Sequence, residues 1–208
     1  MKKISKDFPP VELTDWVNDN PVGEYKDLGW QQRQAIRRAC LTEQYYLCAY
    51  CCKKLAGNGD AMNEHVEAQS RAPDRTLDFS NIVASCKTLN RCDSAHQDQS
   101  FFLTPLMDEC ETELKFKLSG RVKGLSPEAI DTIRVLNLGD NEASNRELVE
   151  ERKQMFDALL FAYRTDGTLE LEDDEIIQSL ITGLDTPAHG KLEAFAPVAV
   201  NFLRGWQA

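Results

Sequence analysis

The chain has 208 residues, with 24 Lys and Arg against 34 Asp and Glu, so its formal net charge is −10. This length allows one large domain or two small ones, and a hydrophobic content of 42% is typical of a folded protein. No stretch approaches the roughly 20 apolar residues of a membrane span, and no apolar segment follows the basic start. We therefore expect a cytoplasmic protein without a membrane span or secretory signal. The acidic balance argues against a general nucleic-acid coat, but not against a nuclease whose divalent cation bridges to phosphate.

Charge and cysteine content divide the chain into unlike halves. Residues 1–104 carry 13 basic and 14 acidic side chains, a net of −1, whereas residues 105–208 carry 11 and 20, a net of −9. Six of the seven cysteines lie in the first half. We therefore predict an N-terminal arm and leading helix over 1–46, a small core over 47–104, and a helical region over 105–208.

The first half reads as an arm, a helix and a loop-rich segment. Residues 1–27 show no sustained period, so we expect an extended arm that Trp16 and Tyr25 attach to the body. Apolar residues over 29–46 recur along one helical face. Residues 47–100 alternate short apolar runs with turn signals, which is typical of a small, loop-rich core.

The second half is predicted to be helical. Ser126 before Pro127 marks one helix start, and Ser144 with Glu147 forms a capping box that opens another. This second helix has apolar residues at helical intervals, namely Leu148, Met155, Phe156, Leu159, Leu160 and Tyr163. Further helices are predicted over 169–184, ending at Gly183, and over 191–206. We interpret these apolar stripes as core packing.

Two pairs of cysteines predict a zinc site. Cys48 and Cys51 have the C-x-x-C spacing that lets two sulfurs reach one ion from a tight turn, and Cys86 with Cys92 supplies a second, wider pair. Cytosolic cysteines in such a cluster indicate a metal site rather than disulfides. Cys52 competes with Cys51 as a ligand, and buried free cysteines are the alternative reading of the whole set.

Polar residues between and after these pairs suggest a hydrolytic site. Glu64 and His65 are adjacent, and Asn81 precedes an apolar run from which its side chain can return to the histidine. A carboxylate suits a hard cation, a neutral histidine can act as a base, and an asparagine can orient the ring. The blander alternatives are a core histidine, a turn asparagine and, for an aspartate after the last cysteine, a helix cap. Further metal ligands are available from Asn90, Asp93 and His96.

These residues together resemble an HNH endonuclease of the zinc-bound subtype. In that family an Asp or Glu precedes the histidine, an asparagine follows, and a His, Asn or Asp comes just after the last cysteine. Glu64, His65 and Asn81 match the first elements. The resemblance implies an α+β fold with a zinc-framed ββα-metal core, structural Zn²⁺ and catalytic Mg²⁺ or Mn²⁺. Three residues are candidates for the last element, namely Asp93, Asn90 and His96.

A wider similarity, over about residues 7–152, is to PtuB-type HNH proteins of Septu and retron anti-phage systems. It is carried by FPPVELTDW, LTEQYYLCAYC, NEHVEAQS, LDFSNIVASC, CDSAH and IRVLNL. The resemblance implies a PtuA-type ATPase as partner, with a retron reverse transcriptase and its nucleic acid as further partners in the retron systems. Two positions depart from the family pattern: Ala68 replaces a frequent proline, and His96 replaces a frequent lysine.

Two functions therefore remain open. The first is a metal-dependent endonuclease that hydrolyses phosphodiester bonds of DNA, or of RNA, as the nuclease subunit of a defence complex. The second is a catalytically idle zinc module that only docks to the ATPase. We expect the intact set of Glu64, His65 and Asn81 to separate them, because a docking module has no need of it. In either case we expect residues 105–208 to form the docking surface, since their negative charge repels nucleic acid.

Overall fold

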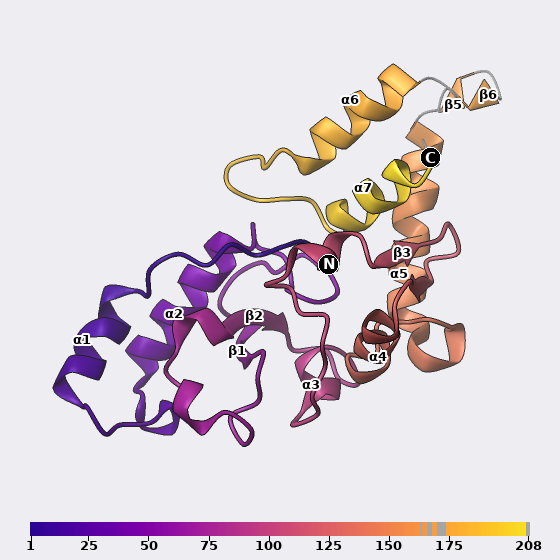
Figure 1. The fold of residues 1–208 in the computed structure, drawn as a ribbon. Helices are drawn as coiled ribbons and strands as arrows, with labels where there is room; N and C mark the ends of the chain where they lie inside the picture. The colour runs from indigo at the N-terminus through magenta and orange to yellow at the C-terminus, as the bar shows by residue number, and fades with distance from the viewer. Residues whose placement is uncertain (163, 166–167, 170–173, 207–208) are drawn as a thin grey trace.

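The protein, described from a computed structural model, has a mixed α+β fold. Residues 1–162, 164–165, 168–169 and 174–206 are described. The helices are α1 (Val11–Asp19), α2 (Trp30–Glu43), α3 (Asp93–His96), α4 (Pro127–Val135), α5 (Glu142–Ala162), α6 (Asp174–Asp185) and α7 (Ala196–Arg204). The strands form three hairpins, β1 (Ala61–His65) with β2 (Ile82–Cys86), β3 (Leu114–Phe116) with β4 (Val122–Gly124), and β5 (Arg164–Thr165) with β6 (Thr168–Leu169). In Figure 1, α1 and α2 lie at the left, α4 and α5 at the right, and α6 and α7 at the top.

The N-terminal segment is more structured than the sequence predicted. Residues 11–19 form α1, so the expectation of an extended arm over 1–27 is wrong. The helix buries Leu13 and packs against α2, and this tertiary contact stabilises a segment whose own helical signal is weak. Trp16 and Tyr25 do attach the segment to the core, and α2 confirms the helix predicted over 29–46.

The hairpin of β1 and β2 lies at the centre of the first half. The strands are antiparallel, with Glu64 opposite Val83 and His65 opposite Ile82. All five residues of β2 are buried, and α2 packs against both strands. The one-turn helix α3 follows the hairpin after a short loop. The order β1, β2, α3 places the predicted polar residues next to the four predicted zinc ligands.

The second half is helical, as predicted, but it also contains the β3–β4 hairpin, which the sequence analysis missed. The Ser126 cap is confirmed, because its side chain accepts a hydrogen bond from the backbone N–H of Ala129. The capping box at Ser144 is wrong. The helix is interrupted at Asn145, whose φ is −154°, and the Asn145 side chain accepts from the N–H of Leu148 instead. A side-chain amide oxygen one residue later therefore takes the capping role.

The last two helices are shorter than predicted. Helix α6 spans Asp174–Asp185, and residue 169 belongs to β6, so the predicted start at residue 169 is wrong. The predicted end at residue 184 lies one residue before the observed end. Helix α7 occupies the middle of the range predicted over 191–206. The apolar faces of α6 and α7 pack on each other, which gives the C-terminal part a small second core. Tyr163, predicted on the α5 stripe, lies outside the described residues.

One continuous core connects the three predicted parts of the chain. Its buried members run from Met1 to Val198 and include Ile36 on α2, Ile82 on β2 and Phe156 on α5. The leading segment, the cysteine-rich core and the helical region therefore share their packing. No helix among the described residues combines the length and apolar character needed to cross a membrane.

Candidate metal centre and adjoining polar site

The first cysteine pair lies in a tight turn directly after α2. The backbone N–H of Cys48 donates to the carbonyl of Lys53 at 2.8 Å, and the N–H of Cys52 donates to the carbonyl of Cys48 at 3.1 Å. The side chain of Gln44 holds this turn against β2, because its Nε2 donates to the carbonyls of Leu47 and Ala84, each at 2.8 Å. A buried amide thus fixes the turn relative to the strand that carries the second pair.

The second pair is supplied by the end of β2 and the start of α3. Cys86 is the last residue of β2, and five residues separate it from Cys92. Cys92 has a φ of 56°, in the left-handed region, and its N–H donates to the carbonyl of Leu136 at 2.9 Å. The wide loop therefore closes onto the first pair, supported by the end of α4.

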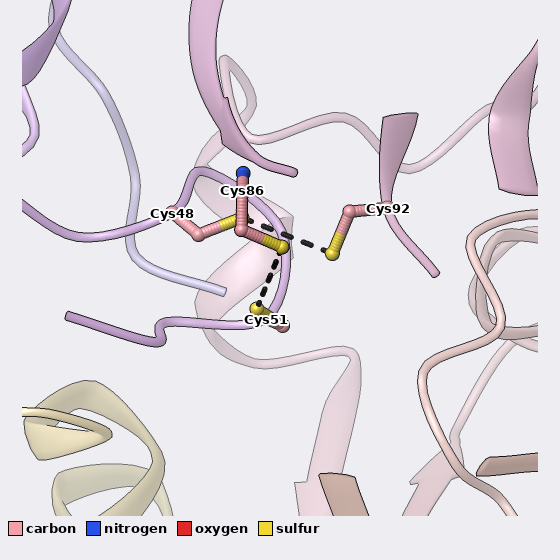
Figure 2. Close-up of side chains that lie close together, drawn as sticks. All are labelled: Cys48, Cys51, Cys86 and Cys92. Atoms are coloured by element: carbon pink, nitrogen blue, oxygen red, sulfur yellow. Dashed lines mark hydrogen bonds between the residues drawn. The ribbon is translucent and has the colours of Figure 1, made fainter. Parts of the chain in front are cut away.

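The four cysteines converge on one point. Their sulfur atoms all lie within 4.8 Å of one another, and all four residues are buried. Figure 2 shows the side chains pointing toward each other, with Cys48 and Cys92 sulfurs 3.8 Å apart and Cys51 and Cys86 sulfurs 4.0 Å apart. Tetrahedral zinc with bonds of about 2.3 Å separates its sulfur ligands by about 3.8 Å. The residues therefore fit a zinc ion.

The geometry distinguishes Cys51 from its neighbour Cys52. Cys51 belongs to the four-sulfur group, whereas Cys52 does not. The carbonyl of Cys52 accepts a hydrogen bond from the N–H of Phe195 at 2.9 Å, and burial raises the pKa of its thiol. Burial also raises the pKa of Cys40 to about 12 and that of Cys110 to about 11. These three thiols are buried and lie outside the four-sulfur group.

Glu64 lies at the centre of a polar site next to the four cysteines. It is buried on β1, and its Oε1 atom accepts a hydrogen bond from the hydroxyl of Tyr50 at 3.2 Å. The Nδ1 atom of His96 lies 2.6 Å from the same oxygen. Asp93, one turn earlier on α3, lies near enough to Glu64 for each carboxyl group to shift the pKa of the other. The hairpin and α3 thus bring together three of the predicted site residues.

Burial raises the pKa values of the two neighbouring carboxyl groups, Glu64 and Asp93. Burial, then the hydrogen bond and charge of Glu64, raise the pKa of Asp93 to about 8. Burial lowers the pKa of His96, so its ring is neutral near pH 7. Its Nε2 atom is buried without a hydrogen-bond partner in the part of the chain that the structure describes. Carboxyl oxygens and an imidazole nitrogen are donor types that divalent cations accept.

His65 follows Glu64 in the strand and has a separate set of contacts. Its ring packs edge-on against Tyr25, with centroids 4.6 Å apart, and its Nε2 atom lies 2.9 Å from the carbonyl oxygen of Thr76. A carbonyl can only accept, so Nε2 carries the proton and Nδ1 keeps its lone pair. Burial lowers the pKa of His65, which keeps the ring neutral at pH 7. A neutral ring with a free Nδ1 lone pair is suited to accept a proton.

Asn81 does not orient His65 directly, contrary to the prediction. Its Oδ1 atom accepts from the backbone N–H of Glu67 at 2.8 Å, and its Nδ2 atom donates to the carbonyl of Glu67 at 3.0 Å. The ring of His65 is held by Thr76 instead. Asn81 therefore closes the loop between β1 and β2, and this loop carries the carbonyl that orients the histidine.

The structure separates the three candidates for the last site residue. Asp93 and His96 both reach Glu64, whereas Asn90 is exposed and its carbonyl accepts from Asn137 at 2.5 Å. The sequence analysis missed Tyr50 and Thr76. The position of Tyr50 between the two cysteines of the first pair was an available signal, because a zinc turn next to β1 directs that residue toward the hairpin. The carbonyl of Thr76 left no signal in the residue type.

Among the described residues, one group of three or more His, Cys, Asp or Glu side chains converges closely enough to hold a metal ion. That group is the four cysteines. Glu64, Asp93 and His96 do not converge to the same degree. A scan against protein-family models and a search of curated proteins find no match for this chain.

Proposed function

We propose that the protein is a metal-dependent HNH-type endonuclease. The observation that carries the proposal is the contact of Glu64 with His96, next to a histidine whose Nε2–H is held by the Thr76 carbonyl. Asp93 lies near enough to this pair to interact electrostatically with Glu64. This arrangement lies on a hairpin and short helix that are framed by four convergent cysteines. Buried, crowded carboxyl groups destabilise a fold, so a catalytic use explains them better than packing does.

Two separate sets of residues would hold two metal ions. Cys48, Cys51, Cys86 and Cys92 would hold structural Zn²⁺, and Glu64 with Asp93 would hold catalytic Mg²⁺ or Mn²⁺. When bound, the divalent cation stabilises the negative charge that develops on the leaving 3′ oxygen. His96 is near enough to Glu64 to orient its carboxylate or to replace Asp93 as a ligand.

His65 takes the role of general base. Its Nδ1 atom accepts a proton from the water that attacks phosphorus, while the Thr76 carbonyl holds the Nε2–H. The lowered pKa of His65 keeps this atom unprotonated at neutral pH. Cleavage by this route leaves a 5′ phosphate and a 3′ hydroxyl end. Asn81 acts as a positioning residue, through the loop that contains Thr76.

The proposed partner is an ATPase of the PtuA type, with a retron reverse transcriptase and its nucleic acid as further partners. The sequence resemblance and the charge of the second half support this part of the proposal. Residues 105–208 carry a net charge of −9, which repels a polyanion and suits a basic protein surface. Co-expression with the neighbouring ATPase and size exclusion at low salt test the interaction. Separate elution, with full nuclease activity from this chain alone, contradicts it.

The nuclease activity is tested by incubation of the zinc-loaded protein with plasmid DNA and, separately, with RNA. We expect cleavage with Mg²⁺ or Mn²⁺, none after chelation of the divalent cation, and none for His65→Ala. His189→Ala is the matched control, because His189 is exposed and far along the chain from this site. Binding to the ATPase without cleavage of either nucleic acid would identify the idle zinc adaptor. Ends with a 3′ phosphate would contradict the role of His65.

A further inference from the structure

Two arginines are buried beside the four-cysteine site. Arg91 precedes Cys92 in the second pair, and Arg152 lies on α5, sixty-one residues further along the chain. Both side chains have 0% exposure and are the largest fully buried side chains in the described part of the protein. Charged side chains are rarely buried to this degree without a compensating charge.

The hydrogen bonds of the two arginines are incomplete. Arg91 donates from Nη1 to Glu151 at 3.1 Å and from Nη2 to Thr88 at 3.3 Å. Arg152 donates from Nη1 to the carbonyl of Leu138 at 2.7 Å, and its guanidinium group stacks 4.9 Å from the ring of Phe116. The Nε atoms of both arginines and the Nη2 atom of Arg152 are buried without a hydrogen-bond partner among the described residues. These N–H groups are donors that an anionic group could satisfy.

The carboxylates contacted by this cluster do not balance its charge. Among the described residues, Glu151 is the one carboxylate hydrogen-bonded to either arginine, and it also binds Lys53 at 2.9 Å. Arg91, Arg152 and Lys53 contribute +3, and Glu151 contributes −1, so the cluster has a net charge of +2. Zn²⁺ with four thiolates has a net charge of −2. The two sums cancel.

The cysteines interact electrostatically with both arginines. The charges of Cys51 and Cys86 favour the cationic form of Arg91. Those of Cys51, of the non-ligand Cys52 and of Cys92 favour the cationic form of Arg152. Burial nevertheless lowers the pKa of Arg152 to about 10. The negative charge of the sulfur atoms therefore opposes the effect of burial on Arg152.

We propose that Arg91 and Arg152 form the cationic outer shell of the zinc site and set its metal affinity and the reactivity of its thiolates. Positive charge and N–H donors near a thiolate reduce its basicity and its rate of reaction with electrophiles. Because Arg152 belongs to α5, zinc binding would also stabilise the docking of the helical second half. This inference rests on the zinc part of the proposed function and is independent of nuclease activity.

The test compares Arg152→Met, which removes the charge but keeps an extended apolar side chain, with Arg152→Lys, which keeps the charge. Zinc affinity is measured by competition with a chromophoric chelator, and thiolate reactivity by the rate at which an alkylating agent releases zinc. We expect Arg152→Met to bind zinc about 10- to 100-fold more weakly and to release it faster. Arg152→Lys should remain close to the wild type. Arg134→Met is the control, since Arg134 is exposed and paired with Asp131.

Glu151→Gln distinguishes an electrostatic role from a packing role. This variant removes a negative charge and breaks contacts with Arg91 and Lys53, so it should lower the unfolding stability yet bind zinc at least as tightly as the wild type. If Arg152→Met does not fold, Arg91→Met supports the same comparison. Equal zinc affinity in wild type and Arg152→Met, or a loss in Glu151→Gln as large as in Arg152→Met, would overturn the proposal.

Discussion

The ring of His65 is held by the backbone carbonyl of Thr76, eleven residues later in the chain, at 2.9 Å from Nε2. This contact determines the tautomer of the histidine, because a carbonyl cannot donate. It also depends on the conformation of the loop between β1 and β2. The chemistry proposed for His65 is therefore sensitive to residues that never touch the ring.

Replacement of His65 by alanine should abolish most cleavage while the protein stays folded. Removal of a general base costs typically 10²–10⁴-fold in rate. Burial lowers the pKa of His65, so its active neutral form persists below pH 6.5, and wild-type activity should fall only as the pH drops through that lowered pKa. Initial rates of plasmid cleavage between pH 5 and 8, at saturating Mn²⁺, measure both effects. An acid limb centred above pH 6.5 would contradict the assignment of His65.

Asn81→Ala should reduce both stability and activity, which separates a positioning residue from a catalytic one. The substitution leaves the backbone N–H and carbonyl of Glu67 without their partner, a loss of about 1–3 kcal/mol. Urea unfolding of the zinc-loaded protein measures the stability, and plasmid cleavage measures the activity. Asn18→Ala, at an exposed position on α1, is the control. Wild-type stability with lost cleavage would instead place Asn81 among the catalytic groups.

Adjacent cysteines should respond differently to substitution. Cys51→Ser removes a ligand from the four-sulfur group and should reduce zinc affinity at least about 10-fold, with a lower unfolding stability. Cys52→Ala should keep one zinc per chain, because Cys52 lies outside that group. Elemental analysis of freshly purified protein measures the zinc content. The reverse result would mean that the turn after α2 binds the metal through Cys52.

Binding of the divalent cation should release a proton near pH 7. The pKa of Asp93 is raised to about 8, so this carboxyl is largely protonated at pH 7 and must lose its proton to bind Mg²⁺ or Mn²⁺. Between its unfolded value of about 3.9 and pH 8 the folded protein binds more protons, so this group makes the cation-free protein less stable as pH rises. Mn²⁺ titrations in buffers of different ionisation enthalpy count the proton. Asp93→Asn should release none, whereas Asp131→Asn, at a half-buried position on α4, leaves the release unchanged.

The four-cysteine metal site could be predicted from the short-range spacing of its cysteines. A C-x-x-C turn brings two sulfurs together by itself, and the second pair needed only a loop of five residues to close. The Ser126 cap and α2 were predictable for the same reason, since each is a local pattern over a few residues. Helix α1 was missed because its stability depends on packing of Leu13 rather than on its own sequence.

Long-range packing decided the rest of the site. Side-chain identity alone could not show that Asn81 bonds to Glu67, that Thr76 orients His65, or that Cys51 rather than Cys52 faces the other sulfurs. Arg152 is the extreme case, because nothing in its local sequence separates it from an exposed helical arginine. Burial of α5 against the cysteine-rich core removes water from its guanidinium group. Without water, an ordinary surface charge becomes one that requires an anion, and only the tertiary contact between the two halves of the chain creates that requirement.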